Sequence, residues 1–170
     1  MFRGSATGAR ARRLALALAI GAAAIPLAGA AGPDRIAMPE GWRLWPHVKT
    51  LVLREGHPLY ADFGGIHHVY ANPAALEGLR SGRYPDGAVL VFDLFEAAEG
   101  EGTLGEGPRK VTAFMVRDAE RFAATGGWGF EAFAGGDPAR PLVGDKAAEA
   151  CFACHEQVAE RGYVFSAWRE

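Results

Sequence analysis

Cysteine and positive charge are both scarce in this sequence. There are only two cysteines in 170 residues, which excludes a small fold held together by disulfides. Residues 1–31 contain four arginines and no acidic residue, so the remaining residues carry 14 basic and 20 acidic side chains, a net charge of −6. A domain this acidic has no electrostatic reason to bind nucleic acid or an anionic membrane. The overall content of 49% hydrophobic and 22% charged residues is typical of a globular protein.

The first 31 residues resemble a targeting segment. A basic lead is followed by an apolar run from Leu14 to Leu27 and then by Ala28-Gly29-Ala30, the small-x-small pattern that signal peptidases accept. The run is shorter than the roughly 20 residues that span a bilayer, and no later run is longer. We therefore predict a cleaved signal peptide (1–31), a single periplasmic domain (32–170) and no stable membrane insertion. An uncleaved anchor helix is the alternative.

The rest of the chain predicts an α+β fold, mainly an antiparallel sheet with short helices and a C-terminal helix. Segments rich in β-branched and aromatic residues predict five strands. Asn72 and Asp118 are suitable helix caps, and Gly162 ends the last helix. The predicted strands are 48–53, 66–70, 88–95, 110–116 and 128–133; the predicted helices are 73–80, 118–124 and 147–161, and the predicted turns or loops are 82–87 and 99–108.

Residues 151–155 (CFACH) carry the clearest chemical signal. A C-x-x-C-H motif is typical of covalent attachment of one haem c. Cys151 and Cys154 can each bond one vinyl group of the porphyrin, and on a helix His155 then lies beneath the ring as an iron ligand. A zinc site would need four ligands, a thioredoxin-type dithiol would begin a helix after a strand, and a simple disulfide would leave His155 unexplained.

The second axial position of the iron stays open at this stage. Electron-transfer cytochromes add a Met or a second His there. Adjacent residues of a strand point to opposite faces of a sheet, so only one of His67 and His68 can face the haem. The candidates in the mature chain are Met38, Met115, His47, His57, His67 and His68.

Four segments together resemble one family. They are 67–73 (HHVYANP), 82–97 (GRYPDGAVLVFDLFEA), 115–133 (MVRDAERFAATGGWGFEAF) and 151–169 (CFACHEQVAERGYVFSAWR). With the haem motif placed after a sheet-rich body, the chain is similar to the cytochrome P-460 / cytochrome c′-beta family. The resemblance implies a mostly antiparallel sheet, a five-coordinate haem iron with a distal pocket lined by the sheet, and often a homodimer.

The resemblance implies one of two activities. Members that oxidise hydroxylamine carry a lysine cross-linked to the porphyrin, in the stretch that corresponds to residues 76–81, where this chain has no lysine. Other members bind nitric oxide or carbon monoxide in an apolar pocket, and by resemblance Phe63 and Phe92 supply its cap. A polar pocket, with His67 or Arg80 pointing inward, would favour hydroxylamine or peroxide chemistry.

The leading hypothesis from the sequence is a periplasmic haem protein that binds small diatomic or nitrogenous ligands such as nitric oxide. The assigned residues are Cys151 and Cys154 for haem attachment, His155 for the iron, and Phe63, Phe92 and His67 for the pocket. The alternatives are an enzyme that oxidises hydroxylamine or reduces nitrogen oxides or peroxide, and a simple electron carrier with a redox partner protein.

Overall fold

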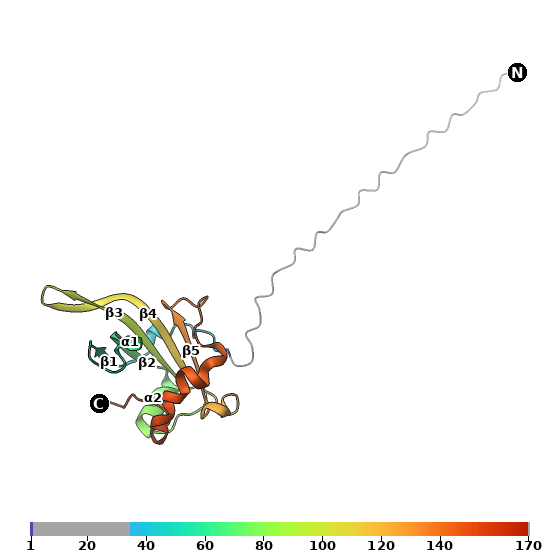
Figure 1. The fold of residues 1–170 in the computed structure, drawn as a ribbon. Helices are drawn as coiled ribbons and strands as arrows, with labels where there is room; N and C mark the ends of the chain where they lie inside the picture. Colours follow the sequence, from blue (N-terminus) through green and yellow to red (C-terminus); the bar gives the residue numbers. More distant parts are fainter. Residues whose placement is uncertain (2–34, 170) are drawn as a thin grey trace. The chain divides into compact units, whose positions relative to one another are not determined.

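A computed structural model describes residue 1 and residues 35–169 (Figure 1). The predicted signal peptide falls almost entirely on residues outside this range. Within the described residues, no helix is long and apolar enough to cross a membrane.

The domain is built on one five-stranded antiparallel sheet. The strands follow one another in the order β1-β2-β3-β4-β5, so each strand pairs with its neighbours in sequence. Consecutive antiparallel strands need only short connections, whereas parallel strands would need long crossover segments. The α+β fold class is confirmed. The strands are β1 (His47–Leu53), β2 (Gly65–Ala71), β3 (Val89–Gly100), β4 (Thr103–Arg117) and β5 (Trp128–Ala134).

The glycine-rich segment 99–108, predicted as a turn or loop, is mostly strand. β3 and β4 continue as a two-stranded hairpin that extends beyond the sheet (Figure 1), with Ala97 opposite Glu106 and Gly100 opposite Thr103. Only residues 101–102 form the turn, and Gly102 has the left-handed φ of 70° that the turn requires. Hydrogen bonding to the partner strand here outweighs the low strand propensity of glycine.

Helix α2 (Pro73–Ser81) begins at the predicted residue and ends one residue later than predicted. The Asn72 side chain accepts hydrogen bonds from the backbone N–H of Ala75, at 2.9 Å, and of Val89, at 3.0 Å. The same carboxamide oxygen therefore caps the helix and ties its start to β3. Gly82 ends the helix with a left-handed φ of 75°.

The other helices that precede the C-terminal segment are short. Two of them, η1 (Trp42–Leu44) and α1 (Tyr60–Phe63), flank β1. The helix predicted over 118–124 is reduced to η2 (Ala123–Thr125), although Asp118 accepts a hydrogen bond from the backbone N–H of Arg121 as a capping residue would.

The two faces of the sheet are covered by different parts of the chain. On one face, α2 and the C-terminal segment pack over a cluster that includes Val69, Leu90 and Phe130. On the other face, the segment around Trp42 packs over Val91 and Phe114. Because each face has its own cover, a side chain's face in the sheet decides whether it can reach the C-terminal haem motif.

Gly65, the first residue of β2, is predicted to be essential for stability. Its φ is +124°, and a Cβ at this position would collide with the backbone carbonyl oxygen of Phe95 on β3. Gly65→Ala should therefore lower the free energy of unfolding by about 3 kcal/mol, measured by urea denaturation. Gly105→Ala is the matched control, because Gly105 also lies in a strand but has open space around it. Equal stability of the two variants would contradict the prediction.

Candidate haem site

The C-terminal segment that carries the CxxCH motif is helical but irregular. The single helix predicted over 147–161 is divided into short pieces. A π-helical turn holds Cys151, and Val158 has non-helical dihedral angles. π-helical turns are frequent at functional sites because they redirect side chains. Gly162 ends the segment, as predicted, with φ 68°. The pieces are η3 (Gly144–Lys146), η4 (Ala148–Phe152), α3 (Ala153–His155) and η5 (Glu156–Arg161).

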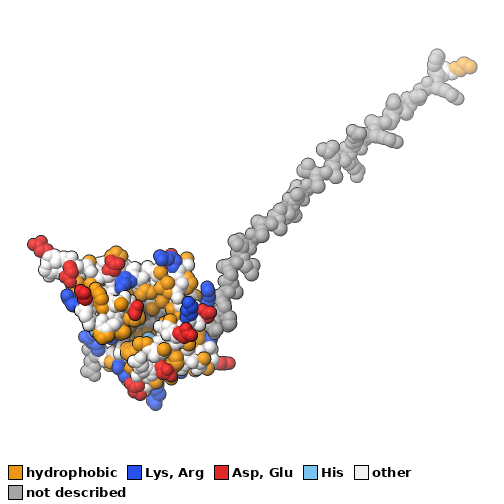
Figure 2. All heavy atoms as spheres, viewed as in Figure 1, with side chains coloured by type: hydrophobic (Ala, Val, Ile, Leu, Met, Phe, Trp, Pro, Cys, Tyr) orange, Lys and Arg blue, Asp and Glu red, His pale blue; other side chains and the backbone are white. Residues whose placement is uncertain are grey.

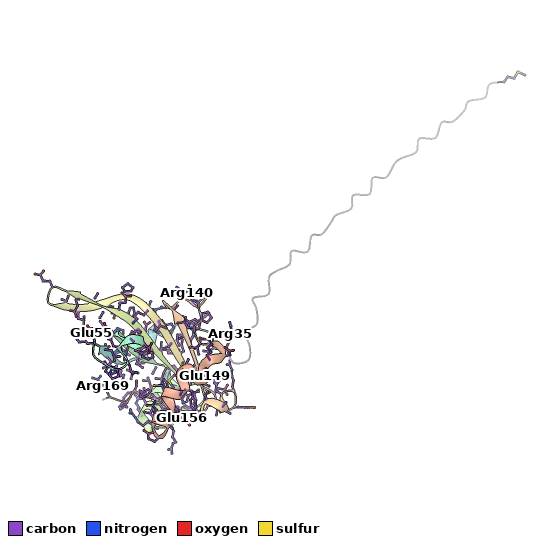
Figure 3. All side chains as sticks on the ribbon, in the orientation of Figure 1. Arg35, Glu55, Arg140, Glu149, Glu156 and Arg169 are labelled. Atoms are coloured by element: carbon purple, nitrogen blue, oxygen red, sulfur yellow. The ribbon has the colours of Figure 1, made fainter. Side chains whose placement is uncertain are left out.

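In Figure 3 the labels Glu149 and Glu156 mark this segment on either side of the motif. The segment lies against the sheet near β5 and α2 (Figure 1). In Figure 2, apolar side chains surround a hollow on this side of the domain.

The two cysteines are free thiols in different environments. Cys151 is half-buried against the core and Cys154 is exposed. Burial raises the pKa of Cys151 to about 11, and the charges of Glu131 and Cys154 act in the same direction. The thiol is therefore protonated at neutral pH, unlike the activated cysteine of a catalytic dithiol. This argues against the thioredoxin-type alternative.

The imidazole of His155 is held in a defined tautomer. Its Nδ1 lies 2.8 Å from the carbonyl oxygen of Tyr163, and the ring packs against Phe130 and Phe165 with centroid separations of 5.1 Å. A carbonyl can only accept a hydrogen bond, so Nδ1 must carry the proton and Nε2 keeps its lone pair. A metal-bound histidine is oriented by the same kind of bond. His155 is thus prepared to bind iron through Nε2.

The Tyr163 carbonyl is positioned by an unusual turn. Gly162 and Tyr163 both have left-handed φ values, 68° and 67°, and Tyr163 is the only non-glycine residue in the described range with a positive φ. The indole N–H of Trp128 donates a hydrogen bond of 3.0 Å to the Gly162 carbonyl. Strand β5 thereby fixes the turn that orients His155.

The register of the sheet places His67 and Phe92 on the same face as the haem motif. The ring of Phe130 on β5 contacts His155. Across the sheet, Phe130 pairs with Met115 on β4, Met115 pairs with Leu90 on β3, and Leu90 pairs with Ala71 on β2. Paired residues share a face, as do residues two or four apart in one strand. His67 precedes Ala71 by four residues and therefore faces the same side. Phe92 lies two residues after Leu90 in β3 and therefore also faces this side.

The three pocket residues predicted from the sequence lie together. The ring of Phe92 is 4.6 Å from that of His67 and 5.9 Å from that of Phe63, the last pair in an edge-to-face arrangement. Phe63, at the end of α1, is 40% exposed, whereas His67 is 5% exposed. The His67 Nδ1 is buried and has no hydrogen-bond partner among the described residues.

Burial also keeps His67 neutral. Its pKa is lowered to about 4, first by burial and then by the positive charges of Lys49 and His68. The pocket side of β2 therefore presents an uncharged imidazole at neutral pH.

This pKa predicts a loss of stability in acid. Between pH 6.5 and about 4 the unfolded chain protonates His67 and the native state does not, so stability falls as the pH is lowered through that window, by up to about 3 kcal/mol. Urea denaturation of the wild type and of His67→Leu, at pH 7.5 and 4.5, measures this contribution. The acid-induced loss should be smaller in His67→Leu; an equal loss would contradict the prediction.

Most candidates for the second axial ligand lie away from this face. Met38 packs with Trp42 on the opposite face. His47 and His68 both hydrogen-bond to the hydroxyl of Thr50, at 2.9 and 2.8 Å.

Further contacts engage His68 and His57 with other groups, which leaves Met115 and His67. His68 also contacts Glu106, at 2.6 Å, and His57 lies in a loop where it accepts a hydrogen bond from the Leu59 N–H. Met115 and His67 are the two candidates on the face of the haem motif, and Met115 pairs with Phe130, next to His155.

Several residues of the site were not identified from the sequence. Lys49 pairs with Val69 and so lies on the haem face of β1, where burial and then the charges of Arg161 and Arg169 lower its pKa. The strand alternation of residues 48–53 could have indicated this face. Arg80, the other residue considered for a polar pocket, packs instead on an aromatic ring: its guanidinium lies 4.0 Å from the ring centroid of Trp168.

Glu131 was also missed. It is 2% exposed, and its carboxylate accepts backbone hydrogen bonds from Val143 and Gly144, at 2.9 and 3.2 Å. These bonds hold the chain that leads into the motif. No local sequence pattern reveals them, because they connect a strand residue to a loop twelve residues later.

The residues present fit a covalently bound haem. Two free thiols three residues apart and a histidine with an available Nε2 lie opposite a sheet face with apolar side chains and an unpaired imidazole. An antiparallel sheet with this motif at its C-terminal end defines a class of sheet-based c-type haem proteins.

The comparison with known families identifies the class more closely. The family described as Cytochrome P460 matches residues 39–166. The chain therefore belongs to the cytochrome P460 family, which implies that it binds haem c. No curated protein matches the sequence.

Proposed function

We propose that the protein is an exported cytochrome with one haem c that binds small ligands such as nitric oxide at a five-coordinate iron. Cys151 and Cys154 would hold the porphyrin through thioether bonds, and His155 would bind the iron through Nε2. When bound, the haem supplies the iron that coordinates the ligand. A homodimer, expected from the resemblance, is part of this proposal.

The observation that carries the proposal is the asymmetry between the two sides of the site. On one side, the Tyr163 carbonyl prepares His155 as a ligand, at 2.8 Å. On the other side, the rings of the phenylalanine pair, Phe63 and Phe92, pack edge to face and would limit the space for a ligand at the iron. An apolar cap of this kind restricts access to the iron, so that small ligands such as diatomics can enter and larger ones cannot.

Two observations favour an enzyme as the second candidate. His67 lies on the haem face, the arrangement expected of a polar pocket. Lys49 lies on the haem face, and its lowered pKa increases the fraction of neutral, nucleophilic amine. It is not at the position of the cross-linking lysine of hydroxylamine-oxidising relatives. A covalent bond between Lys49 and the porphyrin would nevertheless provide the modified haem that this activity is associated with.

The test is the absorption spectrum of the dithionite-reduced, haem-loaded protein before and after addition of nitric oxide. We expect a high-spin five-coordinate spectrum that changes on adding nitric oxide. Sharp low-spin bands that do not respond would overturn the proposal in favour of an electron carrier. A strongly red-shifted Soret band, with Lys49 recovered in a haem-linked peptide by mass spectrometry, would favour the enzyme.

A further inference from the structure

Among the described residues of the haem face, His67 carries a buried polar atom, Nδ1, that has no hydrogen-bond partner. The residue is 5% exposed. A buried polar group without a hydrogen bond costs about 1–3 kcal/mol. A leucine at this position would avoid the cost, so the imidazole needs a partner to offset it.

The described neighbours of His67 do not supply that partner. The ring packs at 4.6 Å against Phe92, which in turn contacts Phe63, and both offer only apolar surface. Its cross-strand partners are Leu51 on β1 and Leu94 on β3. The charged groups close enough to influence it, Lys49 and His68, are both basic, and His68 lies on the opposite face with its own partners.

We propose that the His67 imidazole hydrogen-bonds the small ligand held at the haem iron and thereby determines which ligands the pocket prefers. This inference rests on the proposed function and adds the ligand class to it. The preferred ligands are those that accept a hydrogen bond through a partly negative oxygen or nitrogen, such as nitrogen–oxygen species.

The nearby positive charge supports this class. Lys49 is close enough to lower the pKa of His67, so its field also reaches a ligand beside that ring. A positive field stabilises negative charge that develops on a bound ligand. The phenylalanine pair limits the size of the ligand, while His67 and Lys49 favour ligands that carry partial negative charge.

The experiment compares a good and a poor hydrogen-bond acceptor on the haem-loaded protein. Nitrite binding to the oxidised protein and carbon monoxide binding to the reduced protein are measured by titration, and the C–O stretching frequency is measured by infrared spectroscopy. In His67→Leu we expect the ratio of nitrite to carbon monoxide affinity to fall about tenfold, the effect of one hydrogen bond. The C–O frequency should rise, because a hydrogen-bond donor lowers it.

Neighbouring positions provide the controls. His68→Leu removes the adjacent imidazole of the same strand, but from the opposite face, and should leave both measurements at wild-type values. His67→Gln keeps an N–H donor and should recover part of the nitrite affinity.

Each outcome has a distinct meaning. Unchanged nitrite and carbon monoxide binding in His67→Leu, with normal binding by the wild type, overturns the role of His67 alone. A low-spin wild type that becomes high-spin in His67→Leu would make His67 an iron ligand and overturn it as well. A wild type that binds neither nitric oxide nor carbon monoxide overturns the proposed function itself.

Discussion

Replacing His155 with glycine is expected to abolish the native visible spectrum of the haem-loaded protein. The Tyr163 carbonyl accepts a hydrogen bond of 2.8 Å from the His155 Nδ1, so the His155 Nε2 is free to bind the haem iron. Without it, the iron must take a ligand from solvent or from another side chain. The change is measured by absorption spectroscopy of the reduced protein.

Added imidazole provides a sharp control for this variant. The glycine leaves a space between Phe130 and Phe165, both 5.1 Å from the native ring, that free imidazole can fill. Imidazole should therefore restore much of the spectrum in His155→Gly and have little effect on His57→Gly, because His57 lies in a loop where it accepts a hydrogen bond from the Leu59 N–H. A wild-type spectrum in His155→Gly without imidazole would show that the assigned ligand is wrong.

Loss of both cysteines is expected to abolish covalent haem attachment. Cys151 and Cys154 are free thiols in the structure, and the chain has no other cysteine to replace them. In Cys151→Ala/Cys154→Ala the denatured polypeptide should have the mass of the protein alone, whereas the wild type should carry the mass of one haem. Mass spectrometry after denaturation measures this directly.

The single variants refine this prediction. Each should keep haem through one thioether, and Cys151→Ala should be the less stable of the two because its side chain is half-buried against the core. Ala153→Ser, which changes a residue between the cysteines, is the matched control and should retain covalent haem. Haem that stays bound to the denatured double variant would contradict thioether attachment at this motif.

Local sequence rules succeeded where the determining interactions are local. Asn72 caps α2, and Gly162 ends the C-terminal helical segment, because these effects depend on a residue and its near neighbours. All five strands appear where β-branched and aromatic residues gather. The rules failed for residues 99–108, where pairing across the hairpin decided the structure, and for the C-terminal segment, which is divided by the π-helical turn that holds Cys151.

The sequence by itself determined the chemistry at one end of the site. The spacing of Cys151, Cys154 and His155 depends only on covalent order, so the haem motif can be recognised without a fold. The predictions of Phe63 and Phe92 came from family resemblance, and the structure places them together with His67.

Only the tertiary structure decided which residues face the motif. The sheet register places His67 and Lys49 on the face of the haem motif and His68 on the opposite face. A left-handed turn places the Tyr163 carbonyl on His155. These relations join residues far apart in the chain, and a shift of one residue in register would move each strand side chain to the other face. The face of the sheet, and with it the ligand chemistry of the pocket, is therefore a property of the fold.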